Sequence, residues 1–139
     1  MRAFLVLLAV LLAACGAPEP PLVVSELEIT KPMPGRQMSA GYLVLTNNTD
    51  EPLRITSVES PQFGRVEVHE TTIEDGVSRM RELAELIVPA HGSVRLQRGG
   101  KHLMLMRPAD LDDGVALQFF SGDTPVLSVD YPFPEEEDR

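Results

Sequence analysis

Short runs in which apolar and polar residues alternate fill most of this chain, and glycines or prolines separate the runs. Alternation with a period of two is typical of β-strands that bury one face. We expect nine strands, near residues 23–30, 41–47, 53–58, 65–72, 77–81, 93–97, 102–107, 115–120 and 126–131. No long helical period is present, although residues 80–87 are compatible with one or two helical turns. The pattern predicts an all-β sandwich or barrel.

Turn residues then predict which strands pair. An Asp75-Gly76 dipeptide between two alternating runs favours a two-residue β-hairpin turn. This turn would place Met80 opposite Thr71, with His69 two residues further along on the same face. Diagonal neighbours of this kind are about 7 Å apart between backbone positions, within reach of long side chains.

Gly99-Gly100 predicts a second two-residue hairpin turn by the same reasoning. Leu103 and Leu105 would then face the core. His102 and Met104 alternate with them, so we expect both to point away from the core, side by side at the surface.

These two segments carry the candidate chemistry. Ten residues separate His69 from Met80, and twenty-one separate Met80 from His102, which Met104 follows two residues later. Imidazole nitrogen and thioether sulfur are neutral, soft donors, and Cu(I) is the biological ion that accepts methionine readily. We therefore interpret the four side chains as a Cu(I) site.

Other histidines and methionines are interpreted more conservatively. Met106 lies on the same predicted face, where it is either a packing residue or an auxiliary ligand. Met33 and Met38 precede the second strand in a segment rich in proline and glycine, and we read them as loop or packing residues. His91, in a Pro-Ala-His-Gly turn, is expected to be a solvated surface histidine.

The start of the chain resembles a secretory signal. Arg2 precedes an apolar run that is too short to span a bilayer and that ends in Leu-Ala-Ala-Cys15, which resembles a bacterial lipobox with an acylated cysteine. We predict a lipoprotein signal over 1–14, a tether over 15–21, a Cu(I)-binding β-domain over 22–131 and an acidic tail over 132–139. The protein would then be extracytoplasmic, held to the membrane only by lipid on Cys15, and periplasmic in a Gram-negative host.

Composition excludes several function classes. Cys15 is the only cysteine, so with lipid on it no thiol remains for a disulfide, for redox chemistry or for a blue-copper site. The chain has 12 basic and 21 acidic side chains, a net charge of −9, which argues against a nucleic-acid partner. We find no nucleophile–base motif and expect no enzyme.

Residues 39–108 resemble the periplasmic copper-A chaperone family (PCuAC), whose members are cupredoxin-like, Greek-key β-domains. The resemblance is carried by Ala-Gly-Tyr-Leu-Val-Leu-Thr-Asn at 40–47, Val-His-Glu at 68–70, Met80, and Gly-Gly-Lys-His-Leu-Met-Leu-Met at 99–106. It implies a non-catalytic Cu(I) carrier that donates copper to the dinuclear centre of cytochrome c oxidase, often alongside a thiol-containing assembly partner. The histidine- and methionine-rich tail of some relatives is replaced here by an acidic one, which argues against a second, Cu(II) site.

The expected mechanism is ligand exchange. Both histidines must be neutral to bind, so Cu(I) affinity should fall as the pH drops through about 6.5, where free imidazole protonates. Two alternatives stay open: a copper-tolerance buffer, and a lipid-anchored structural or adhesive β-sandwich without metal. In the last case the histidines and methionines would be scattered in space.

Overall fold

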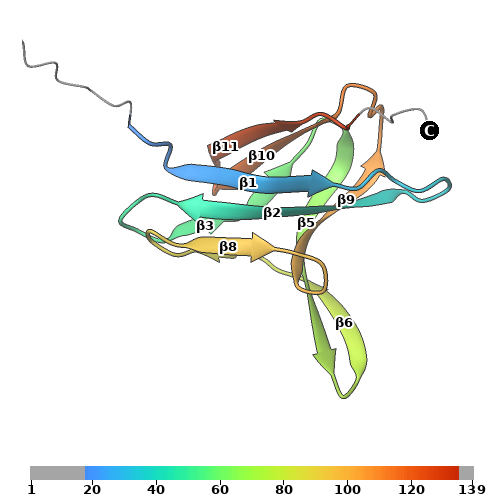
Figure 1. Cartoon of the computed structure of the whole chain (residues 1–139), viewed down its shortest axis with the longest axis horizontal. Helices are drawn as coiled ribbons and strands as arrows, with labels where there is room; N and C mark the ends of the chain where they lie inside the picture. The colour runs from blue at the N-terminus through green and yellow to red at the C-terminus, as the bar shows by residue number, and fades with distance from the viewer. Residues whose placement is uncertain (1–17, 135–139) are drawn as a thin grey trace, which may run out of the picture.

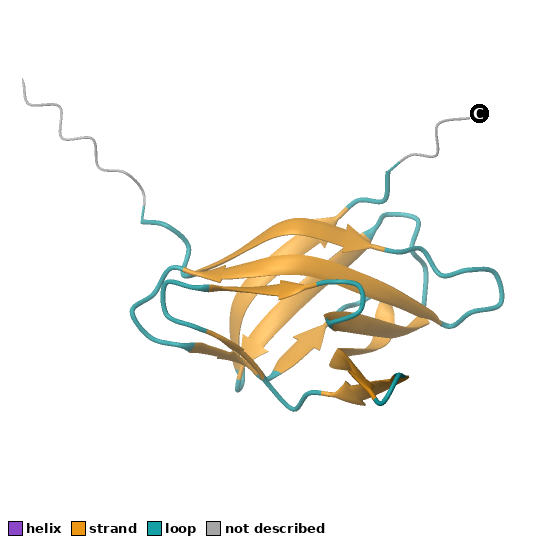
Figure 2. Cartoon of the chain, turned by 60° about the horizontal axis from the view of Figure 1, so that its bottom comes forward, coloured by secondary structure: helices purple, strands orange, loops and turns teal. Residues whose placement is uncertain are grey.

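The computed structural model describes residues 18–134, and these form eleven β-strands and no helix (Figures 1 and 2). Within this part of the chain, no helix long and apolar enough to cross a membrane is found. The predicted all-β class is confirmed. The strands are β1 (Leu22–Ile29), β2 (Met38–Asn47), β3 (Leu53–Ile55), β4 (Ser57–Glu59), β5 (Phe63–Glu74), β6 (Val77–Glu82), β7 (Leu86–Val88), β8 (Ser93–Leu96), β9 (Lys101–Pro108), β10 (Val115–Ser121) and β11 (Thr124–Tyr131).

Nine strands make one sheet with the order β1-β2-β9-β5-β4-β10-β11, in which β6 also pairs with β5 and β8 also pairs with β2. The sheet curls until its end strands β1 and β11 come into contact, which gives a nearly closed barrel. The remaining strands, β3 and β7, pair with each other as a separate two-stranded sheet. Closure leaves few open strand edges.

The core follows the alternation in the sequence. Leu103 and Leu105 of β9 are fully buried, and Val68 of β5, which lies opposite Leu103, is buried beside them. The buried cluster consists only of leucine, isoleucine, valine and phenylalanine, so no methionine of the described residues belongs to it. Among the described residues, methionine therefore does not fill the core.

Two local expectations are wrong. Residues 53–58 were expected to form one strand, but the chain leaves the small sheet at Thr56 and joins the large one, which brings Ile55 and Val58 into the core three residues apart. Residues 80–87 form no helical turn. Their first part belongs to β6 and their last part to β7, because Leu86 and Val88 bury their side chains by pairing with β3.

The prediction of a two-residue hairpin turn at Gly99-Gly100 is also wrong. Strands β8 and β9 do not pair with each other but with successive parts of one edge of β2, where Leu43 lies opposite Leu96 and Gly41 opposite Leu103. Only Gly99 has a positive φ, of 77°, whereas a type I′ hairpin requires two such residues. The chain makes a β-turn instead, in which the Gly100 amide donates to the carbonyl oxygen of residue 97 at 3.1 Å.

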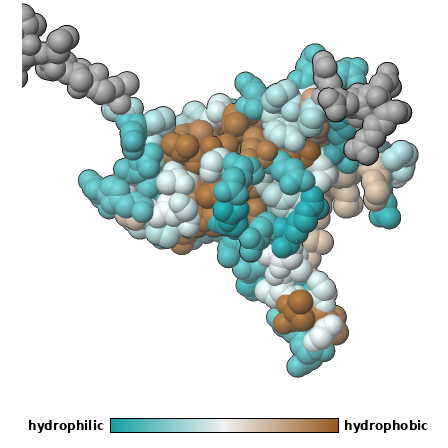
Figure 3. Space-filling model, viewed as in Figure 1, coloured by the Kyte–Doolittle hydropathy of each residue, from teal (hydrophilic) through white to brown (hydrophobic). Residues whose placement is uncertain are grey.

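The β5–β6 hairpin forms as predicted. Asp75 and Gly76 both have positive φ values, of 52° and 76°, as a type I′ turn requires, and Met80 lies opposite Thr71. The hairpin projects from the barrel, and every residue of β6 is exposed (Figure 1). Apolar side chains are visible at its tip, where Ile73 and Val77 are exposed (Figure 3).

The signal over 1–14, the lipid site at Cys15 and residues 135–139 lie outside the described residues, so they stay predictions. The fold extends slightly beyond both ends of the β-domain predicted over 22–131. The Asn48 side chain and backbone amide donate to the carbonyl oxygens of Pro20 and Pro21, each at 3.0 Å. Phe133 packs edge-on against Tyr131, with 5.6 Å between the ring centroids.

Candidate metal centre

Two histidines face each other on neighbouring strands. His69 of β5 and His102 of β9 are directly opposite in the antiparallel register, and their ring centroids are 5.9 Å apart. Directly opposite residues share one face of a sheet, and neighbours along a strand alternate between faces. Because Val68 and Leu103 fill the core, the two imidazoles lie together on the other face.

His102 was expected at the surface, and this is wrong, because only 8% of the residue is exposed. The turn that precedes β9 lies beside its ring. The carbonyl oxygen of Gly100 accepts hydrogen bonds from the Thr71 amide at 3.0 Å and from Nδ1 of His102 at 3.1 Å. A carbonyl oxygen only accepts, so Nδ1 carries the proton and Nε2 of the neutral ring is left with a free lone pair.

His69 is fixed by a carboxylate. Its Nε2 donates to Oε2 of Glu67 at 2.6 Å, and Arg65 forms an ion pair with the same carboxylate. The His69 side chain is only 16% exposed, and its Nδ1 is buried without a hydrogen-bond partner. A carboxylate that holds the second nitrogen of an imidazole is the usual support of a metal-binding histidine. The buried lone pair on Nδ1 therefore fits a metal ligand.

The two methionines approach the same place. Met104 follows His102 on the same face of β9 and lies opposite Glu67, while Met80 on the projecting hairpin is 53% exposed. Met80, His102 and Met104 line one groove of about 700 Å³. His69 is not among its lining residues, and it joins the set through its contact with the His102 ring. The four predicted residues thus occupy neighbouring positions across β5, β6 and β9.

The groove contains residues that the sequence did not point to. Met33 and Met38, interpreted above as loop or packing residues, also line it and are 63% and 48% exposed. Met38 lies opposite Met106, the proposed auxiliary residue, across the β2–β9 pair. Alternation along β2 shows that Met38 shares a face with Ala40, which lies opposite Met104, but nothing in the sequence places the loop residue Met33.

Charged groups surround the groove without entering it as ligands. Its lining includes three basic residues, Lys31, Arg36 and Arg98, and no acidic one. Arg98 lies over the Tyr42 ring, 4.6 Å from the centroid, and pairs with a carboxylate on β1 at 2.7 Å. No group of three or more histidine, cysteine or acidic side chains suited to a metal occurs in the described part of the chain.

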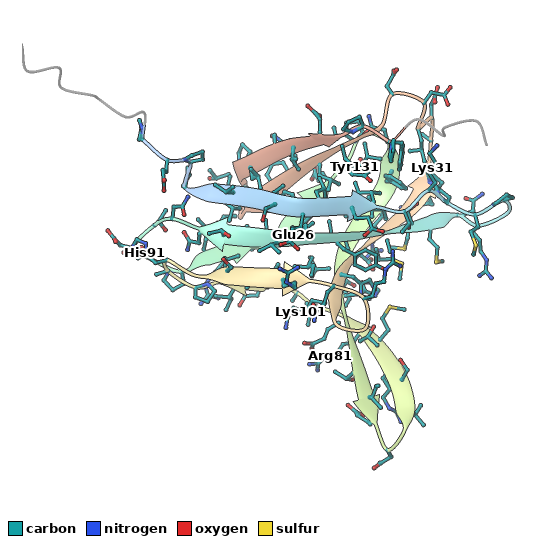
Figure 4. All side chains as sticks on the ribbon, viewed as in Figure 1. Glu26, Lys31, Arg81, His91, Lys101 and Tyr131 are labelled. Atoms are coloured by element: carbon teal, nitrogen blue, oxygen red, sulfur yellow. The ribbon has the colours of Figure 1, made fainter. Side chains whose placement is uncertain are left out.

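Nearby side chains on the hairpin base are tied to one another. Arg81 and Lys101 donate hydrogen bonds to Glu70 and hold the pKa of that carboxyl below its usual value. The labels in Figure 4 show Arg81 and Lys101 close to where the hairpin leaves the barrel, with His91 at the far end of the molecule. His91 is exposed and bonded to Asp50 at 2.6 Å, which confirms it as a surface histidine.

Comparison with known proteins gives the family. Residues 22–119 match the family described as "Putative lipoprotein LpqE-like". This chain belongs to the LpqE-like family. The LpqE-like chain is also 29% identical over 91 residues to "Uncharacterized protein RP573" of Rickettsia prowazekii (strain Madrid E), a match that covers 62% of this chain and 50% of the relative. The chain therefore spans about half the length of that curated relative.

Solved structures share the fold. The copper-bound PCuAC domain from PmoF2 matches this LpqE-like chain with a TM-score of 0.64 at 16% identity, over 84% of this chain and 94% of that one. The solution structure of CuI-DR1885 from Deinococcus radiodurans matches with a TM-score of 0.56 at 28% identity, over 84% of this chain and 78% of that one. The predicted resemblance to the PCuAC family and its cupredoxin-like fold is confirmed.

Proposed function

We propose that this LpqE-like protein is an extracytoplasmic copper chaperone that binds one Cu(I) with His69, Met80, His102 and Met104. The observation that supports it most directly is the pair of opposed imidazoles, one of which keeps a buried nitrogen without a partner. The likeness to a Cu(I)-containing protein at 28% identity points the same way. A structural or adhesive β-sandwich would give no reason for this convergence.

Burial of the ligands suggests how the ion is passed on. The two imidazoles are largely covered, whereas Met80 is half exposed on the projecting hairpin. An incoming ligand from an acceptor therefore reaches the ion most easily by displacing the Met80 thioether. Neutral ligands leave the bound ion with its single positive charge, and thiolate ligands of an acceptor bind it more strongly. The acceptor we propose is the dinuclear copper centre of cytochrome c oxidase or its thiol-containing assembly partner.

Copper binding is tested by anaerobic titration of the full chain with Cu(I) against a chromophoric chelator. The chain carries Cys15→Ser, so that no thiol competes for the ion. We expect one tight equivalent, which His69→Ala and His102→Ala each abolish, while His91→Ala leaves it unchanged. Equal effects of all three histidine substitutions would contradict the proposed ligand set.

Delivery is tested in the host. Deletion of the gene should lower cytochrome c oxidase activity when copper is scarce, and added copper should restore it. Loss of copper tolerance with normal oxidase activity would instead favour the role of a buffer. The proposed anchor is tested separately, because radiolabelled fatty acid should be incorporated into the wild-type chain and not into Cys15→Ser.

A further inference from the structure

Methionines gather on one side of the barrel. The chain has six of them, and all five in the described residues lie on or next to the groove. Met33, Met38, Met80 and Met104 line it, and Met106 lies opposite Met38 on the same face. Since Met80 and Met104 belong to the proposed chaperone site, three thioethers remain without an assigned role.

Packing does not explain the two exposed side chains, Met33 and Met38, whereas Met106 is half-buried. The buried cluster contains no methionine, so the residue is not used here to fill gaps in the core. Met33 and Met38 are 63% and 48% exposed, and an exposed apolar side chain contributes little to stability. What distinguishes methionine from leucine at such a position is its sulfur.

The segment that carries Met33 is held in place. The Thr30 amide donates to the Ala40 carbonyl oxygen and the Arg107 amide to that of Gln37, both at 2.9 Å. Between these points the Arg36 amide closes a turn on the Met33 carbonyl oxygen at 2.8 Å. The loop is therefore fixed to the sheet at both ends, and Met33 is positioned at the groove.

Charge makes this end of the groove selective. Lys31 and Arg36 line it, and no carboxylate does, so hard divalent ions find none of their preferred ligands there. A doubly charged ion is repelled by such a rim twice as strongly as a singly charged one. Neutral sulfur ligands favour a soft, monovalent ion.

We propose that Met33, Met38 and Met106 form a second Cu(I) site, made only of thioethers, from which the ion enters the histidine site. This inference rests on the proposed function. The exposed fraction of the residue falls from 63% at Met33 and 48% at Met38, in the proposed second site, to 8% at His102 in the histidine site. The ion is first bound by sulfur near solvent and then gains buried imidazole ligands, which makes the second step favourable.

The test is a Cu(I) titration of the full chain with Cys15→Ser, in mild detergent and without oxygen, followed by NMR of ¹³C-labelled methionine methyl groups. Single Met→Leu variants assign the signals. We expect the first equivalent of Cu(I) to shift the Met80 and Met104 methyls. The second equivalent should shift those of Met33, Met38 and Met106.

The decisive variant is Met33→Leu/Met38→Leu, which keeps side-chain volume and apolar character and removes both sulfurs. It should lose the second binding event and retain the first. Ile87→Leu is the matched control, because Ile87 is 46% exposed and lies outside the groove, and it should keep both events.

Each other outcome has a distinct meaning. Binding that stops at one equivalent, with only Met80 and Met104 shifted, overturns the second site and leaves the proposed function intact. Shifts of all five methyls with the first equivalent overturn it as well, because one ion would then use a single shared site. If no equivalent binds, the proposed function fails too.

Discussion

Glu67 offers the sharpest test of how the histidine site is built. Its carboxylate accepts the 2.6 Å hydrogen bond from Nε2 of His69 and so leaves the lone pair on the buried Nδ1 without a competing partner. We predict that Glu67→Gln lowers Cu(I) affinity although Glu67 is not itself a ligand. The substitution keeps an acceptor oxygen and removes its charge.

The size of the effect follows from the kind of hydrogen bond. A hydrogen bond to a charged group contributes about 1.5–3 kcal/mol and a neutral one about half as much. Replacing the first by the second therefore costs about 0.8–1.5 kcal/mol, which is about a three- to tenfold loss of affinity. Glu67→Leu removes the acceptor altogether and should approach the hundredfold loss typical of a missing outer partner.

Competition with a chromophoric Cu(I) chelator under anaerobic conditions measures both variants. Glu82→Gln is the control, since Glu82 lies opposite His69, is 52% exposed and undergoes the same change of charge. Copper should also shift the ¹⁵N signal of Nδ1, and not Nε2, of His69. An affinity of Glu67→Gln within about twofold of the wild type, or equal to that of the control, would refute the reasoning.

Three further predictions follow from other parts of the molecule. Met80→Leu and Met104→Leu should each weaken the tight Cu(I) equivalent by more than about tenfold in the same competition assay, because a ligand is lost rather than its support, while Met33→Leu should leave that equivalent unchanged. Leu105→Ala should lower the free energy of unfolding by about 2–5 kcal/mol in urea titrations, since Leu105 is fully buried; a loss below about 1 kcal/mol would mean that the site collapses around the cavity. The lowered pKa of Glu70 means that its carboxylate stabilises the fold above the ordinary value of 4.5 and loses this effect as the pH falls further. Glu70→Gln should therefore unfold at a lower temperature than the wild type at neutral pH, and the two unfolding temperatures should converge in acid. A difference in unfolding temperature that persists in acid would contradict this.

The alternation of apolar residues was enough to predict much of the site. It placed Leu103 and Leu105 in the core and His102 and Met104 on the opposite face, and the Asp75-Gly76 turn gave the register that puts Met80 opposite Thr71. Both inferences use local rules, because a strand's parity and a two-residue turn depend on neighbouring residues.

Long-range pairing was not accessible in the same way. The Gly99-Gly100 pair fits a hairpin by local rules, but β8 and β9 each pair with β2, which is distant in the sequence. Burial of His102 follows from the resulting turn, and the position of Met33 follows from a loop that has no periodic pattern. Such features depend on which strands meet, and the pattern of a single strand does not determine this.

The projecting β5–β6 hairpin separates cargo release from the integrity of the fold. Strand β6 buries no side chain and pairs with β5 alone, so detaching it exposes almost no new apolar surface. Local opening of this kind requires far less free energy than global unfolding, and the backbone amides of Val77–Glu82 should exchange their hydrogens much faster than those of β9. Met80 can thus move away from the proposed site while His69 and His102 keep their positions on the nearly closed barrel.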